Sequence, residues 1–87
     1  MNTPMSVIAR VYEHIEPLDR GSRYEDPLDD VLRASRLGEV TGGGSHLGKN
    51  GEIEFADIEI NIANPDDALP LIATTLERAG ASSGFAI

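Results

Sequence analysis

The sequence contains no cysteine and no tryptophan, and only four of its 87 residues are aromatic. The missing cysteines exclude a disulfide framework, a thiolate metal site and a cysteine nucleophile. The longest uninterrupted apolar run is three residues, whereas a membrane-spanning helix needs about 20. Residues 1–4 lead directly into a strand-like pattern, without the apolar core of a secretory signal. We therefore expect a cytoplasmic protein without a membrane partner.

Positive charge is scarce as well. The chain has 7 Lys and Arg residues against 15 Asp and Glu residues, a formal net charge of −8. Proteins bind nucleic acids chiefly through cationic side chains that displace counterions from the phosphates, so we expect no nucleic-acid partner. A chain this short buries only about 60 to 65% of its surface on folding. The length predicts a single domain over residues 1–87, with a compact core and little room for a buried active site.

Two segments alternate apolar and polar side chains as strands do. In residues 5–15, Arg10, Tyr12 and His14 occupy positions that alternate with an apolar set, which is Met5, Val7, Ala9, Val11 and Ile15. In residues 52–62, the isoleucines that follow Ala56 share one face. Ile53 and Phe55 break the phase of the second segment. This break predicts either a bulge near Ala56 or a strand start that is covered on both faces.

A turn signal precedes the second of these strands. Asn50-Gly51 is typical of a hairpin turn, so we expect residues 39–47 to pair as the other arm of a hairpin. Residues 85–87 are long enough for a short edge strand.

Two further segments have the apolar stripe of a helix. The first is predicted to begin with Asp26 as the N-cap and Pro27 in the first turn, and to end at Gly38. Residues 16–25 ahead of it lack any period and predict a loop.

The segment Asn64-Pro65-Asp66-Asp67 offers several caps for the second helix, which is predicted to end at Gly80. If Asp67 is its cap, Pro70 lies in the first turn, where the missing N–H costs nothing.

The order strand, helix, strand, strand, helix, strand is that of the split βαβ, or ferredoxin-like, fold. The resemblance is one of element order only and implies an α+β domain. Its four-stranded antiparallel sheet would have the spatial order 4-1-3-2, with two helices on one face and the other face open. This arrangement brings His14, the loop at 16–26, His46 and the turn at Lys49-Asn50 to one end of the molecule, which is the expected functional surface.

Cations and an aromatic residue are expected to meet at that end. Arg20, Arg23 and Lys49 are three of the seven cationic residues, and together with Tyr24 they could hold a carboxylate or phosphate ligand. The more ordinary interpretation is that the loop arginines form ion pairs with neighbouring acidic residues.

Two histidines and a carboxylate define a possible metal site. His14 and His46 are the only histidines, and with Glu52, or Glu54, they are ligand types that divalent metals accept. The outer strands lie roughly 10 Å apart, so the three side chains would have to share one face. Two surface histidines are the simpler interpretation, and we expect no cofactor.

The Gly42-Gly43-Gly44 run predicts a bend, a bulge or a close backbone approach by another chain. It opens no helix and lacks the lysine spacing of a phosphate-binding loop. Asp57 and Glu59, with Glu52 or Glu54, form an acidic row, which is either a solvated face or a surface for a basic partner.

No catalytic motif is present, since Ser22 and Ser45 lack the surroundings of a nucleophile. We therefore expect a non-enzymatic interaction or regulatory domain that forms a homodimer through its open sheet face or its glycine-rich edge strand. One alternative is an antagonist of a basic protein, suggested by the net charge of −8. The other is a small-molecule or metal sensor that uses the end containing residues 16–26.

Overall fold

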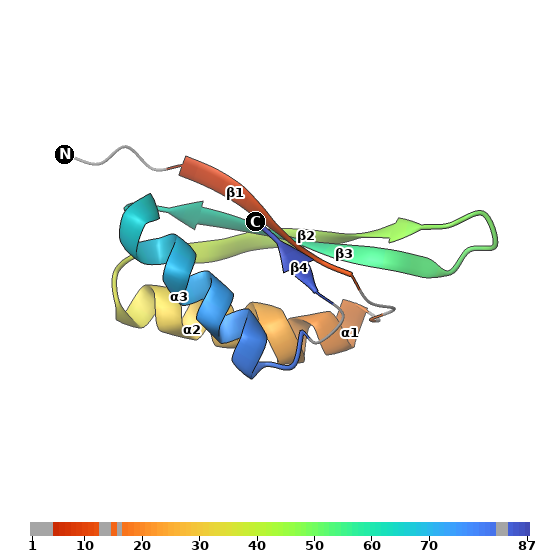
Figure 1. Ribbon diagram of the computed structural model, residues 1–87, viewed down its shortest axis with the longest axis horizontal. Helices are drawn as coiled ribbons and strands as arrows, with labels where there is room; N and C mark the ends of the chain where they lie inside the picture. Colours follow the sequence, from red (N-terminus) through yellow and green to blue (C-terminus); the bar gives the residue numbers. More distant parts are fainter. Residues whose placement is uncertain (1–4, 13–14, 16, 82–83) are drawn as a thin grey trace.

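Four strands form one antiparallel sheet in the order β2-β3-β1-β4. The computed structural model describes residues 5–12, 15, 17–81 and 84–87. The strands are β1 (Met5–Val11), β2 (Gly38–Leu47), β3 (Ile53–Ile62) and β4 (Phe85–Ala86). The fold is thus α+β, and the predicted element order and strand order are both confirmed (Figure 1).

The helices pack beneath one face of this sheet, as Figure 1 shows for α2 (Asp26–Ala34) and α3 (Pro65–Arg78). Strand residues of one parity face them, so that the alternation seen in the sequence becomes a division between core and surface. Among the described residues, no helix is long and apolar enough to cross a bilayer. The buried strand side chains are those of Ala9, Val11, Ala56, Ile58, Ile60 and Ile62.

Residues 17–25 are helical, so the predicted loop at 16–25 is wrong over this range. The helix α1 (Pro17–Arg20) runs through one wide π-helical turn, η1 (Gly21–Glu25), into α2 without a break. The backbone N–H of Asp26 donates to the carbonyl of Gly21, five residues back. Asp26 is therefore not an N-cap.

The wide turn ends at Glu25, two residues before Pro27, whose ring would crowd the carbonyl four residues earlier in a regular α-helix. Widening the helix there lets it continue. It also directs Tyr24 into the core, where its side chain is fully buried together with Leu28 and Leu32. The sequence gives no helical pattern here, because residues 19–26 are charged, glycine or serine apart from Tyr24. A single buried side chain produces no apolar periodicity.

The end of α2 lies before the predicted stop at Gly38. Arg36 has a positive φ of 60°, and the N–H of Leu37 donates to the carbonyl of Leu32 over 2.9 Å, which is the Schellman arrangement usually built on glycine. Gly38 instead begins β2, where a Cβ atom would collide with the carbonyl oxygen of Asn61.

The helix α3 begins after the first of its candidate caps. Asn64 is its N-cap residue and Pro65 is the first helical residue, so Asp67 is not the cap and Pro70 lies inside the helix. A proline at the first position is already in helical geometry, which favours the earlier start. The predicted end is confirmed, since Gly80 has a φ of 93° and the N–H of Ala81 donates to the carbonyl of Leu76.

The β2–β3 hairpin closes through the predicted turn. The N–H of Gly51 donates to the carbonyl of Gly48 and closes the turn, and Gly51 itself has a φ of 79°. The predicted bulge near Ala56 occurs slightly earlier, because the register shifts between the pairs His46–Phe55 and Leu47–Ile53. In Figure 1 this hairpin projects beyond β1 and α1.

Candidate functional site

Two surfaces of the sheet are candidate sites of contact: its open face, which no helix of the described residues covers, and the outer edge of β2, which pairs with no described strand. The open face presents the strand residues that alternate with the core, and β2 is the terminal strand on its side of the sheet.

An ion pair with two hydrogen bonds crosses the open face. Arg10 on β1 stands opposite Asp57 on β3. The Nε of Arg10 donates to Oδ1 of Asp57 over 2.8 Å, and Nη2 donates to Oδ2 over 3.1 Å. The hydrogen bond to Asp57 raises the pKa of Arg10 above its ordinary value. This bidentate geometry fixes the direction of the guanidinium plane.

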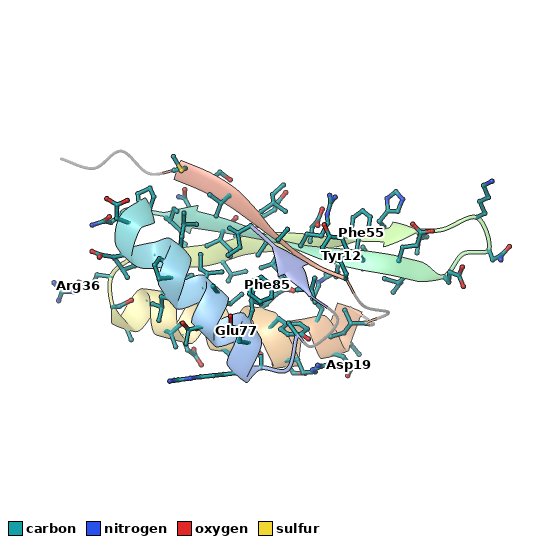
Figure 2. All side chains as sticks on the ribbon, viewed as in Figure 1. Tyr12, Asp19, Arg36, Phe55, Glu77 and Phe85 are labelled. Atoms are coloured by element: carbon teal, nitrogen blue, oxygen red, sulfur yellow. The ribbon has the colours of Figure 1, made fainter. Side chains whose placement is uncertain are left out.

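The guanidinium of Arg10 also covers an aromatic ring. Its central carbon lies 3.9 Å from the ring centroid of Phe55, and the ring of His46 stacks on Phe55 at 4.6 Å with an interplanar angle of 3°. Because β1 and β2 flank β3 on opposite sides, Arg10 and His46 cover opposite faces of the Phe55 ring. Tyr12 meets Phe55 edge-on at 6.3 Å (Figure 2).

Exposed apolar surface adjoins this stack. Ile8 and Tyr12 are 48% and 46% exposed. Ile8 alternates with core residues on β1, and Tyr12 follows Val11, the last residue of that strand. Formal charge cancels between Arg10 and Asp57. We call the surface formed by the following residues the aromatic patch: Ile8, Arg10, Tyr12, His46, Phe55 and Asp57.

The glycine run lies on the edge strand β2, with its members facing alternate sides. A Cβ atom on Gly43 would stand 3.1 Å from Nε of Arg20 and 3.3 Å from a carboxylate oxygen of Glu25, so the helical segment packs directly against the backbone there. A Cβ atom on Gly42 would stand 3.0 Å from Oε2 of Glu59, whereas one on Gly44 would meet nothing within 4 Å.

The predicted ligand-binding residues are divided between three places. Arg20 pairs with Glu25 at 3.0 Å and donates to Oγ of Ser45 over 2.9 Å. Arg23 donates to the hydroxyl of Tyr24, whose ring lies in the core. Lys49 lies in the turn at the tip of the projecting hairpin. Arg20 therefore has the acidic partner that the ion-pair interpretation expects, whereas Arg23 contacts the Tyr24 hydroxyl and the Gly80 carbonyl.

Of the predicted metal ligands, the structure describes His46, Glu52 and Glu54. His14 lies outside the described residues. His46 stacks on Phe55, and its Nε2 lies 3.8 Å from Oε2 of Glu54, while Glu52 is exposed at the start of the returning arm. Within the described ranges, no group of three or more His, Asp or Glu side chains has the arrangement of a metal site.

The predicted acidic row consists of two different carboxylates. Asp57 is held by Arg10. Glu59 leans over Gly42, and its carboxylate has no partner in the part of the chain that the structure describes. Only Glu59 therefore remains available for another molecule.

Asp29 was absent from the sequence-based candidates, yet it closes part of the β2 edge. Its Oδ1 accepts a hydrogen bond from the backbone N–H of Val40 over 2.9 Å, and its Oδ2 accepts one from Arg33 over 2.8 Å. These contacts, the backbone one foremost, lower the pKa of Asp29. Beside it a groove of about 280 Å³ is lined by Glu25, Asp26, Asp29, Val40, Thr41 and Gly42.

The aromatic patch was also missed, although Arg10, Tyr12 and Phe55 gave a usable signal. Arg10 and Tyr12 alternate with core residues, and Phe55 breaks the phase of its strand. Only the strand register brings them together. No family model, curated protein sequence or solved structure matches the chain, so the geometry of these surfaces carries the functional interpretation.

Proposed function

We propose that this chain is a ferredoxin-like, non-enzymatic interaction domain that pairs with a second copy of itself through the aromatic patch. The element order, the strand order and the placement of α2 and α3 under one face support the assignment to that fold class. The observation that carries the functional part is the stack of Arg10, Phe55 and His46 beside exposed Ile8 and Tyr12.

Charge favours this surface for contact between two copies. Each copy has a formal net charge of −8, so that most approaches of one copy to another are repulsive. Arg10 and Asp57 neutralise each other within the aromatic patch. Two copies that meet there bury apolar area together with a charge pair that is already satisfied. The unpaired carboxylate of Glu59, which stands opposite Ile8 on the same face, leans away from the patch over Gly42.

The geometry of the patch also suits a symmetric interface. A twofold axis places the same residues of both copies in contact, and two sheets pack face to face about 10 Å apart. Tyr12 and Ile8 would fill the space between the sheets. Since Phe55 is already held between two cross-strand neighbours, ordering it on association costs little conformational entropy.

Sedimentation equilibrium over a wide concentration range tests the proposal. The unmodified chain should pass from monomer to dimer as its concentration rises. Ile8→Asp buries an unpaired charge in the interface and should weaken association at least tenfold. Leu18→Asp is the matched control, because Leu18 is 89% exposed on α1 and its replacement should leave the dimer constant unchanged.

Either of two results would contradict the proposed dimer. One is a monomer at every concentration up to the millimolar range. The other is equal loss of association in Ile8→Asp and Leu18→Asp, which would indicate a general effect of added negative charge.

A further inference from the structure

The outer edge of β2 has no strand partner among the described residues, because β2 is the terminal strand of the sheet. Asp29 already accepts the N–H of Val40, which closes the start of this edge. Beyond Val40 the edge continues through Gly42, Gly43 and Gly44 to His46. An unpaired strand edge is a template for another extended chain.

Two available carboxylates flank the open part of this edge at Gly42. Glu59 leans over Gly42 from the helix-free side, with Oε2 3.0 Å from the position that a Cβ atom would take. Asp26 lines the groove on the helix side, next to Gly42. Neither carboxylate has a hydrogen bond or ion pair with any residue that the structure describes.

We propose that the outer edge of β2 binds an extended basic segment of another protein as a fifth strand opposite Gly42–Gly44. Alternate side chains of an added strand point to opposite faces of the sheet. Two adjacent Lys or Arg residues would therefore reach Glu59 on one face and Asp26 on the other.

The glycines make this reach possible. An added strand would lie about 4.8 Å from β2 and roughly 10 Å from the backbone of β3. A side chain at position 42 would stand between the partner and Glu59, whereas Gly42 leaves that path open. A long cationic side chain can then meet the Glu59 carboxylate, which already inclines toward the edge.

A second copy of the chain is a poor occupant of this edge. Pairing β2 with itself would bring the Asp26, Asp29 and Glu59 side chains of both copies to the same seam, and like charges across paired strands repel. The same carboxylates attract a cationic segment. The edge therefore differs from the aromatic patch in the partner that it favours.

The test uses a capped peptide of sequence Thr-Val-Thr-Lys-Arg-Thr-Val-Thr, with a Glu-Glu version as the peptide control. Amide resonances of Gly42–Gly44 should shift on titration of the full chain with the Lys-Arg peptide, and their hydrogen exchange should slow. The Glu-Glu peptide should leave them unchanged.

Charge-neutralising variants make the test quantitative. Glu59→Gln should weaken binding of the Lys-Arg peptide about fivefold at low salt, the size of one surface ion pair. The double variant Asp26→Asn with Glu59→Gln should weaken it roughly twentyfold, because the two sites lie on opposite faces. Asp66→Asn with Glu77→Gln removes the same charge from α3 and should change affinity less than twofold; Figure 2 shows Glu77 in the helical layer.

Several results would overturn the proposal. They are no binding of the Lys-Arg peptide up to millimolar concentration, equal binding of both peptides, equal weakening by the two double variants, or resonance shifts confined to the aromatic patch. If amide hydrogen exchange at Gly42–Gly44 becomes slower as the protein concentration rises, without any peptide, the edge binds a second copy instead.

Discussion

The aromatic patch and the outer edge of β2 both include residues of the β2–β3 hairpin, but their charged groups differ: those of the patch are paired, and those of the edge are not paired with any described residue. In the patch, Arg10 and Asp57 satisfy each other and Phe55 is covered on both ring faces. At the edge, Asp26 and Glu59 remain without partners among the described residues. Within one strongly acidic chain, neutralising charge locally favours contact with an identical copy, and leaving it unpaired favours a cationic partner.

The largest expected effect comes from removing the support that both surfaces share. Ile58 is fully buried on β3 between its cross-strand neighbours Ala9 and Gly43. Ile58→Ala should lower the free energy of unfolding by about 2 to 5 kcal/mol, because it leaves a cavity in the core, and urea denaturation measures the loss. Ile58→Val, the smaller change, should cost about 1 kcal/mol; equal losses would contradict tight packing around this side chain.

The next effect separates the two surfaces. Phe55→Ala removes the ring between Arg10 and His46 and should lower stability by about 1 to 2 kcal/mol, measured by thermal or urea denaturation. Self-association should weaken with it, whereas affinity of the β2 edge for the Lys-Arg peptide should stay within twofold. Loss of peptide binding in this variant would mean that the two surfaces are one.

A matched pair of substitutions compares the two faces of β2 itself. Gly43→Ala places a methyl group 3.0 Å from the carbonyl oxygen of Asp57 and against Arg20, so it should destabilise the fold by about 1 to 2 kcal/mol. Gly44→Ala meets nothing within 4 Å and should be neutral or stabilising by about 0.5 kcal/mol. Equal unfolding free energies for the two variants would contradict the packing of α1 and η1 against Gly43.

The smallest effect concerns the closed start of the edge. The pKa of Asp29 is lowered in the folded chain, so the ionised carboxylate stabilises the folded state. This stabilisation is fully present above the pKa of an aspartate in the unfolded chain, about 3.9. It is lost as the pH falls through the lower pKa of Asp29 in the folded chain. Asp29→Asn should cost about 1 kcal/mol at pH 7, and the cost should shrink below about pH 4.

Asp30→Asn is the control for that prediction, because Asp30 is the exposed neighbour of Asp29 on α2 and has no described partner. Denaturation curves at several pH values should show a pH-dependent difference from the parent only for Asp29→Asn. The same pH dependence in both variants would contradict the hydrogen bond to Val40.

The regular parts of the fold could be predicted from the sequence because their signals are local and periodic. Alternation on β1 and β3, the turn at Gly51 and the stop at Gly80 each depend on residues close in the chain. The helical run over 17–25 could not be predicted in this way, since it depends on Tyr24 finding a place in a core assembled from distant segments.

The candidate surfaces were predicted less completely, for a reason that is also physical. The glycine run and Glu59 stand out in the sequence by their residue types, so the sequence already makes the β2 edge a candidate. The stack of Arg10, Phe55 and His46 depends on cross-strand register, including the shift beside His46. A displacement of one residue would send these side chains to opposite faces of the sheet.

The two tyrosines lie in different environments, so that their fluorescence reports on different parts of the molecule. With no tryptophan in the chain, tyrosine dominates its intrinsic fluorescence. Tyr24 is fully buried beneath the sheet, while Tyr12 is 46% exposed on the aromatic patch. A soluble quencher should therefore reduce the fluorescence of Tyr12 but not that of Tyr24. Emission from a Tyr12→Phe variant would follow the integrity of the core alone, and that from Tyr24→Phe would follow events at the surface.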